Sequence, residues 1–372
     1  MEEDKKTYEI ENNKIIKTIN IYNTKKAPET RCYFSANYVK KFKSIVCIGG
    51  TNKNCDLVGV VKGYNTEKNT WKTYDESESF DKPITGHTST VVSDKKIEKL
   101  FVFGGFDESN NYTTHAYLLS TGEMAQSQID FRKNKRGVAE YPPPRAYHTA
   151  NYDAKTNCVY IYGGTDMNIS NSKKESFQSV WEFSLDNLCW EKIVLSNPNK
   201  NGAPRGHISI KKDRKLYIFG GVILFKKFTN ALFSIDLDRK VVENIEYNGA
   251  SPQPVAFHSG DIINERCFIV QGGLDQNYNP INDCYVYYFS TKMFVKIEIP
   301  LIPALFGHKL ISNNEGSVFI VGGMDSFKYV GDENLIYKPE KEGDDIFNQI
   351  EEEIKFNPME QMFEMVLKIE DL

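Results

Sequence analysis

Residues 158–164 read CVYIYGG, a run of strand-forming residues that ends in two glycines, and this stretch decides the fold. Similar runs end in the same pair five more times, as IVCIGG, LFVFGG, LYIFGG, FIVQGG and VFIVGG. The pairs recur about every 50–60 residues, which is typical of a protein built from repeated supersecondary units. We assign a structural role in the following turn to all twelve glycines: Gly49, Gly50, Gly104, Gly105, Gly163, Gly164, Gly220, Gly221, Gly272, Gly273, Gly322 and Gly323.

Each glycine pair is preceded by a second repeated mark, a proline followed by a histidine. Five copies carry it, namely Pro83 with His87, Pro144 with His148, Pro204 with His207, Pro254 with His258 and Pro303 with His308. The first copy departs from the pattern and has Phe34 at the histidine position. Downstream, an aromatic residue leads to a bulky anchor, as from Tyr64 to Trp71. Because these runs are short, β-branched and bounded by turn residues, they predict strands rather than helices.

This combination of motifs resembles the kelch-repeat β-propeller family over residues 13–338. The resemblance implies an all-β, six-bladed propeller with one four-stranded antiparallel blade per repeat. The last repeat lacks a good fourth strand, so a terminal segment must close the ring. We expect residues 15–22, which alternate apolar and polar side chains, to form the outer strand of that blade, with residues 363–369 as the alternative. Residues 339–372 are predicted to form an acidic amphipathic helical tail, with one helix beginning at Asn357.

The composition excludes several classes of function. The 372 residues include 46 Lys plus Arg and 50 Asp plus Glu, for a net charge of -4, so no global positive field favours nucleic acid. No apolar run approaches the roughly 20 residues of a membrane-spanning helix. Seven scattered cysteines fit reduced thiols better than disulfides or zinc ligands. We therefore expect a cytoplasmic monomer that binds neither nucleic acid nor metal and does not insert into membranes.

The candidate catalytic residues are better explained by the repeat. Five of the six histidines occupy the repeated position, which favours hydrogen bonds within a turn over metal binding or catalysis. Asp107, Asn111 and the off-pattern His115 are similar to the Glu-x3-Asp-x3-His iron ligands of plant specifier proteins, which are kelch propellers, but two of the three positions differ. A neutral asparagine is a poor iron ligand. We expect no enzyme activity and no cofactor, with an iron-dependent lyase as the alternative.

Candidate partner-binding residues lie in the loops that a kelch propeller projects from one face. The loop after the fourth glycine pair is apolar and basic, and it contains Phe225, Lys226, Lys227 and Phe228. Around the channel mouth we expect Arg145, Tyr147, Arg205 and Phe257 to meet an acidic peptide, because arginine binds carboxylates in a bidentate manner. Two alternatives remain open: the apolar loop packs on its own blade, and the arginines have a structural role in the repeat.

The sequence thus predicts a non-enzymatic scaffold or adaptor that binds protein partners. Because nearly the whole chain is propeller, it is similar to the compact kelch proteins that act as effectors of endosomal Rab GTPases, which implies a role in vesicle trafficking or cytoskeletal organisation. A ubiquitin-ligase substrate receptor is an alternative, with the C-terminal helix as its docking segment. The expected tail helix packs either on a partner or on its own propeller.

Overall fold

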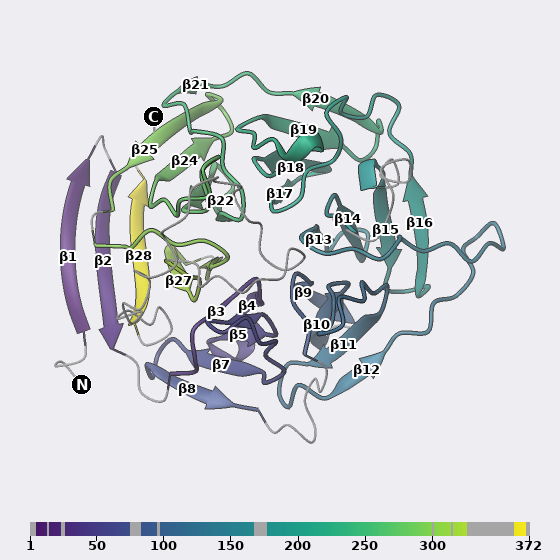
Figure 1. Cartoon of the computed structure of the whole chain (residues 1–372), viewed down its shortest axis with the longest axis horizontal. Coiled ribbons are helices and arrows are strands. Elements are labelled where there is room, and N and C mark those ends of the chain that lie inside the picture. The colour runs from purple at the N-terminus through teal and green to yellow at the C-terminus, as the bar shows by residue number, and fades with distance from the viewer. Residues whose placement is uncertain are drawn as a thin grey trace, which may run out of the picture.

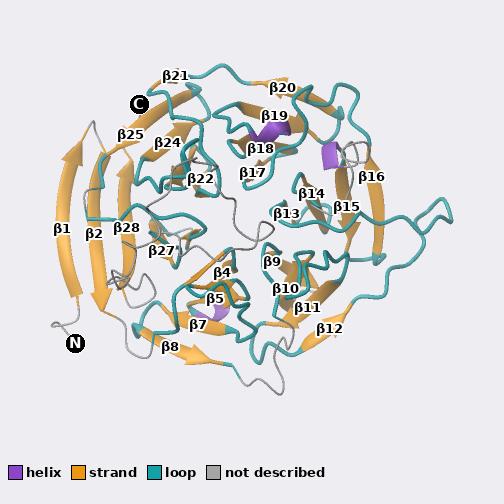
Figure 2. Cartoon of the chain, in the orientation of Figure 1, coloured by secondary structure: helices purple, strands orange, loops and turns teal. Residues whose placement is uncertain are grey.

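The computed structural model describes residues 5–12, 15–23, 27–74, 83–94, 97–166, 177–299, 301–313, 315–325 and 361–369. Six mainly antiparallel sheets stand around a central axis, each with its innermost strand beside the axis and its outermost strand at the rim (Figure 1). Strands make up nearly all regular structure in the described residues, with short 3-10 turns at Lys40–Phe42 and Leu224–Lys226 (Figure 2). The predicted all-β, six-bladed propeller is confirmed.

Blades one to four each have four strands, ordered from the axis outward. Blade one comprises β4 (Ser35–Val39), β5 (Ser44–Ile48), β7 (Lys62–Asn65) and β8 (Thr70–Thr73). Blade two comprises β9 (Thr88–Asp94), β10 (Ile97–Phe103), β11 (Ala116–Ser120) and β12 (Gln126–Gln128). Blade three comprises β13 (Thr149–Asp153), β14 (Cys158–Tyr162), β15 (Val180–Ser184) and β16 (Cys189–Ile193). Blade four comprises β17 (Ile208–Lys212), β18 (Lys215–Phe219), β19 (Leu232–Asp236) and β20 (Val241–Asn244).

Blades five and six each have a fifth strand. Blade five comprises β22 (Ser259–Asn264), β23 (Cys267–Gln271), β24 (Cys284–Tyr288) and β25 (Met293–Ile297), with the short β21 (Asn248–Gly249) parallel to β25. Blade six comprises β26 (Lys309–Ser312), β27 (Ser317–Val321), β28 (Gln361–Ile369), β2 (Ile15–Asn23) and β1 (Lys5–Asn12). A separate two-stranded ladder pairs β3 (Arg31–Cys32) with β6 (Thr51–Asn52). Both ends of the chain therefore contribute strands to blade six (Figure 1).

The prediction of a helix beginning at Asn357 is wrong for residues 361–369, because these residues form strand β28 between β27 and β2. Met362 packs with the cluster between blades six and one, whereas Met365 packs with the cluster between blades five and six. A strand in a propeller blade is covered on both faces, so its apolar residues need not alternate. The resulting spacing imitates that of a helix. The remainder of the expected tail lies outside the described residues.

The hydrophobic core is divided among the interfaces between neighbouring blades. Val46 and Ile48 of blade one, for example, pack with Leu100 and Val102 of blade two, and all four are at most 1% exposed. The closing interface follows the same plan, since Ile45 of blade one packs with Phe319 and Met362 of blade six. This stacking explains why the middle strands of each blade are almost wholly apolar.

The paired glycines make the close approach of the blades possible. A Cβ atom on the first glycine of a pair would clash with the next blade, as at Gly104, where it would be 2.8 Å from the His148 Cε1 atom. The second glycine donates its N–H to a backbone carbonyl of the next blade, as from Gly105 to Arg145 at 2.8 Å. The corresponding bond from Gly323 to Arg31, also 2.8 Å, joins blade six to blade one. The structural role predicted for the pairs is clear at these positions.

Candidate functional site

A central channel of about 540 Å³ runs between the innermost strands of the six blades. Its walls come from β4, β9, β13, β17, β22 and β26, and they carry many hydroxyl and amide side chains. Lys211, Asp261 and Lys309 are the charged residues among the described residues that line it. A polar cavity of this size is within the range of small-molecule sites in proteins.

One end of the channel is surrounded by a closed ring of backbone hydrogen bonds. The residue before each repeat histidine position donates its N–H to the carbonyl of its counterpart in the preceding blade, at 2.8–3.0 Å. The six members in order are Tyr33, Gly86, Tyr147, Gly206, Phe257 and Gly307, and all six have positive φ, between 55° and 66°. The ring runs through blade six to blade one, so it also locks the closing interface.

Aromatic residues and glycines alternate around this ring. The rings of Tyr33, Tyr147 and Phe257 meet edge to face, with centroids 5.3–5.4 Å apart in all three pairs. The glycines provide the space, because a Cβ atom on Gly206 would be 2.8 Å from the Phe257 ring. We call Tyr33, Tyr147 and Phe257 the aromatic plug. Mutual contact of three rings on the axis closes this end of the channel.

The repeat histidines connect neighbouring blades. Ser35 of blade one contacts the Nε2 atom of His87 at 2.8 Å, Thr88 contacts that of His148 at 2.9 Å, and Thr149 contacts that of His207 at 3.1 Å. Burial lowers the pKa of His87 and His207 to about 3, so both stay neutral. For His87, His148 and His207 the partner is thus a hydroxyl group of the preceding blade rather than a turn, whereas His258 and His308 are buried without a hydrogen bond from either ring nitrogen to any described residue.

Arg145 does not reach the surface. Its side chain is 0% exposed, and its guanidinium donates to the carbonyl oxygens of Gly163 at 3.0 Å and Pro143 at 3.2 Å. The guanidinium carbon also lies 4.8 Å from the centre of the Phe177 ring, and burial lowers the pKa of Arg145 to about 9. Arg31, at the same repeat position in blade one, donates to the Gly49 carbonyl at 3.3 Å. The structural alternative therefore holds for Arg145, which is not part of the candidate partner-binding surface.

Arg205 stands one position closer to its repeat histidine and has different surroundings. It is partly exposed, and among the described residues no hydrogen bond or ion pair engages its guanidinium. Burial lowers the pKa of Arg205, while the hydroxyl groups of Tyr147, Tyr278 and Tyr112 lie close enough to oppose that shift. Tyr147 also belongs to the aromatic plug. We call Arg205, Tyr112, Tyr147 and Tyr278 the arginine site.

The apolar loop of blade four is only partly exposed. Val222 and Phe228 are both 3% exposed and form a β-bridge, and the Phe228 ring packs edge to face on Tyr278 at 5.2 Å. Leu224 is 39% exposed, and Lys226 and Lys227 face solvent. The side chain of Phe225 lies outside the described set. The exposed lysines of this loop therefore lie near the arginine site, and the buried Phe228 packs the loop against Tyr278 of that site.

The carboxylates that follow the glycine pairs shape their own loops. The Asp107 carboxylate accepts hydrogen bonds from the N–H groups of Ser109 and Asn111, both at 2.9 Å, and from the Asn111 side chain at 3.1 Å. Asp275 makes the same three bonds with Asn277 and Asn279, at 2.8–3.2 Å. Asp107 and Asp275 are therefore turn residues, each held by the backbone of its own loop. Within the described ranges, no three His, Cys, Asp or Glu side chains are grouped as metal ligands.

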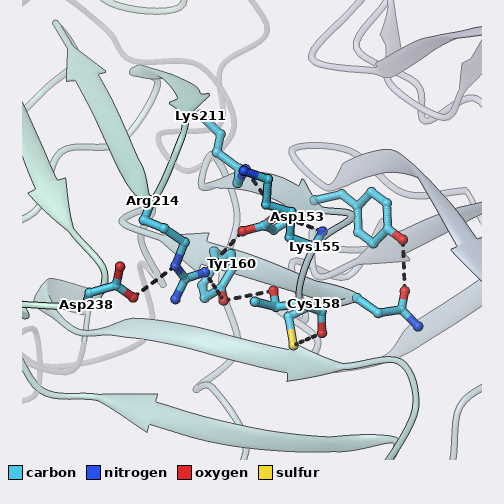
Figure 3. A network of polar contacts seen from close by, with 10 residues as sticks. Asp153, Lys155, Cys158, Tyr160, Lys211, Arg214 and Asp238 are labelled. Atoms are coloured by element: carbon cyan, nitrogen blue, oxygen red, sulfur yellow. Dashed lines mark hydrogen bonds and ion pairs between the residues drawn. The ribbon is translucent and has the colours of Figure 1, made fainter.

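A buried ion-pair network joins blades three and four near the turns β13–β14 and β17–β18 (Figure 3). The Asp153 carboxylate, 2% exposed, contacts Lys211 at 3.3 Å and Arg214 at 3.1 Å. Arg214 also donates to the Tyr160 hydroxyl at 2.8 Å and to Asp238 at 3.0 Å. Burial raises the pKa of Asp153, but the Lys155 N–H, Arg214 and Lys211 outweigh burial and lower it. Lys211 of the channel wall therefore has a permanent counter-ion.

Comparison with known proteins agrees with this architecture. The chain is 22% identical to the host cell factor homolog hcf-1 of Caenorhabditis elegans over 61% of its own length and 30% of the relative. It is 22% identical to Mei4-dependent protein 6 of Schizosaccharomyces pombe, over 70% of this chain and 40% of the relative. Against beta-scruin of Limulus polyphemus the identity is 25%, over 57% of this chain and 22% of the relative. The chain thus spans less than half the length of these curated relatives.

In the part of the chain that the structure describes, we find no helix with the length and apolar character of a membrane span.

The family model described as the KLHDC2/KLHL20/DRC7 Kelch-repeats domain matches residues 98–323, which is more than half of the chain. This match covers the second to sixth glycine pairs, the same residues that join one blade to the next. The chain belongs to the kelch-repeat family.

Proposed function

We propose that this chain is a non-enzymatic scaffold that binds protein partners through the loop face around the arginine site. The observation that carries the proposal is Arg205, a partly exposed guanidinium that no carboxylate of the described residues neutralises and whose pKa burial lowers. A partly desolvated, unpaired charge favours a ligand that supplies the opposite charge. Phenol hydroxyl groups around it can donate to the same ligand. These features support an acidic peptide as the partner segment.

The lysines of the blade-four loop extend the same electrostatic preference. Lys226 and Lys227 face solvent on a loop whose bridge joins Val222 to Phe228, and Val222 is itself bridged to Arg205. An acidic segment that pairs with Arg205 would meet these lysines next. Charged groups at the rim of an interface mainly affect the association rate, whereas a desolvated arginine contributes to affinity. We therefore assign the main contribution to Arg205.

The test is affinity capture from the protein's own cells with wild type, Arg205→Ala and Arg132→Ala. Arg132 is an exposed arginine in the segment between blades two and three, and it serves as the matched control. We expect Arg205→Ala to lose the main partner and Arg132→Ala to retain it, with both variants melting like wild type. Full retention of every partner by Arg205→Ala would show that another surface is used.

Within this class we propose a role in vesicle trafficking or cytoskeletal organisation, in the manner of effectors of endosomal Rab GTPases. The proposal is supported by the resemblance of the repeats over residues 13–338 to those of kelch proteins of this kind. Direct binding to Rab GTPases loaded with GTP or GDP tests it, and an effector prefers the GTP form. The alternative of a ubiquitin-ligase receptor needs a helix as docking segment, and residues 361–369 of that segment are a strand of blade six.

A further inference from the structure

Lys309 occupies a channel position that three of the blades use for a contact with the next blade. The residue after the repeat histidine position is Ser35, Thr88 and Thr149 in blades one to three, and each hydroxyl contacts the histidine of the next blade. Blade six has Lys309 at this position, and the next blade has Phe34 instead of a histidine. The ammonium group therefore lacks the partner that the hydroxyl groups have.

No other group in the described part of the chain takes the place of that partner. Among the described residues, the Nζ atom of Lys309 makes no hydrogen bond within 3.5 Å and has no carboxylate oxygen within 4.0 Å. The other lysine of the wall, Lys211, is paired with Asp153 at 3.3 Å. The Asp261 carboxylate accepts from the N–H groups of Ile262 and Ser312, both at 2.8 Å. The histidines nearest to Lys309 are His87, His148 and His308, which burial keeps neutral.

The surroundings of Lys309 disfavour the charged form of its side chain. Burial alone lowers the pKa of Lys309 to about 8, so the group is still mostly protonated at neutral pH. The other blades have an uncharged residue at this position, namely Ser35, Thr88, Thr149, Ile208 and Ser259. A partly buried cation without a counter-ion is a candidate site for an anion.

We propose that the channel binds a small hydroxylated organic monoanion, with its carboxylate group on the Lys309 ammonium and its hydroxyl groups on the polar wall. The volume of about 540 Å³ accommodates such a molecule. Asn37, Asn151 and Ser209 line the wall and are partly exposed, and the Asp261 carboxylate, which also lines it, can accept hydrogen bonds from the hydroxyl groups of the ligand.

A single charge is favoured because one cation is available and Asp261 would repel a second negative charge. The aromatic plug closes one end of the channel, so the ligand enters from the end opposite Tyr33, Tyr147 and Phe257. This site is separate from the loop face, so the proposal of a channel ligand does not depend on the proposed partner binding.

The experiment uses the full chain and a matched pair of probes. Gluconate and sorbitol have the same number of carbon atoms, but only gluconate carries a carboxylate. Isothermal titration calorimetry is performed on wild type, Lys309→Thr and Lys211→Gln, with acetate as a minimal carboxylate. Lys309→Thr introduces the residue that blades two and three have at this position, and Lys211→Gln removes a lysine that is already paired, while Arg214 still holds Asp153.

We expect gluconate to bind wild type at one site and sorbitol not to bind. Lys309→Thr should weaken gluconate binding by at least about tenfold, as the loss of a charge-assisted contact implies, whereas Lys211→Gln should change it by less than about threefold. Gluconate should also raise the melting temperature of wild type and leave that of Lys309→Thr unchanged. Equal affinity in wild type and Lys309→Thr, or no binding of either carboxylate to wild type, would overturn the proposal.

Discussion

Gly163 lies against the imidazole of His207 in the next blade, so closely that a Cβ atom on Gly163 would be 2.6 Å from the His207 Cε1 atom. The same carbon would also clash with the backbone carbonyl oxygen of Pro204. Neither neighbour can retreat easily, because the Gly164 N–H binds that carbonyl at 2.9 Å and Thr149 contacts His207 at 3.1 Å. The first glycine of each pair is therefore required by the spacing of the blades as well as by its positive φ.

We accordingly expect Gly163→Ala to be strongly destabilising. An alanine at positive φ costs about 1–2 kcal/mol, and the overpacking adds about 1–3 kcal/mol. Gly137→Ala is the matched control, because Gly137 also has positive φ, of 75°, but no atom lies within 4 Å of its Cβ position. Urea unfolding of both variants separates the two contributions. Equal losses of unfolding free energy would mean that the contact with His207 does not matter.

The repeat makes the number of blades predictable, because a glycine pair with its apolar run is required once per blade interface. The aromatic plug is also visible in the sequence, as the alternation of Tyr33, Gly86, Tyr147, Gly206 and Phe257 before the histidine position. A comparison of single repeats does not show the aromatic plug, because aromatic residue and glycine alternate from one repeat to the next. The three aromatic residues come from every second blade, and they meet only because the six blades form a closed ring.

The two arginines of the predicted site show a limit of repeat alignment. Arg145 stands three residues before His148, and Arg205 stands two residues before His207. Adjacent strand positions face opposite ways, so one guanidinium is buried under its own blade and the other faces the loops. The helix predicted for the tail rests on the helical spacing of Met362 and Met365, although they are buried on opposite faces of a strand. Only knowledge of the neighbours on both faces resolves that ambiguity.

At a residue of the aromatic plug, a glycine variant should be more stable than an alanine variant, which is the reverse of the usual order of stability. Tyr147 has a φ of 56°, a value that glycine adopts without strain. Both Tyr147→Ala and Tyr147→Gly lose the contacts with Tyr33 and Phe257, but alanine keeps the backbone strain. We expect the glycine variant to be more stable than the alanine variant by about 1 kcal/mol in urea unfolding. A more stable alanine variant would contradict the strain that we assign to this ring.

Because β28 closes the propeller, we expect the buried side chain of Met365 to contribute strongly to the stability of the fold. Met365 is 1% exposed and packs with Val318 and Ile320 of β27 and with blade five. Met365→Ala should lower the unfolding free energy by about 2–5 kcal/mol, as truncations of buried methionines do. Val366, the partly exposed neighbour on the other face of the strand, is the control, and Val366→Ala should cost clearly less. A similar cost for both variants would contradict the packing described for β28.

A chain that ends at residue 338 extends this prediction. It lacks β28, so β2 keeps only β1 as a partner and the edge of β27 is uncovered. We expect this truncated chain to melt at least several degrees below the full chain and to aggregate when heated, because an open sheet edge pairs with other chains. Static light scattering during a thermal ramp measures both effects. An unchanged melting temperature would mean that β28 does not hold the ring closed.

The buried histidines should make the propeller sensitive to acid. Burial lowers the pKa of His87, His207, His258 and His308 to about 3 in the folded chain, from the ordinary histidine value of 6.5 that applies once the chain unfolds. As pH falls below 6.5, the unfolded chain takes up protons that the folded chain does not, so stability decreases with falling pH down to about pH 3. Each such histidine costs about 2 kcal/mol at pH 5, and several together approach the whole stability of a typical domain.

His258→Phe tests this account at one site. Phe34 already fills the same position in blade one, and Ile208, the residue that faces His258 from blade four, has no hydroxyl group to lose as a partner. We expect the variant to unfold like wild type at pH 7.5 and to lose less stability than wild type between pH 6.5 and pH 5, by about 1.4 kcal/mol per pH unit. Urea unfolding at several pH values measures the slope. An identical slope in wild type and His258→Phe would show that His258 does not remain neutral in the folded chain.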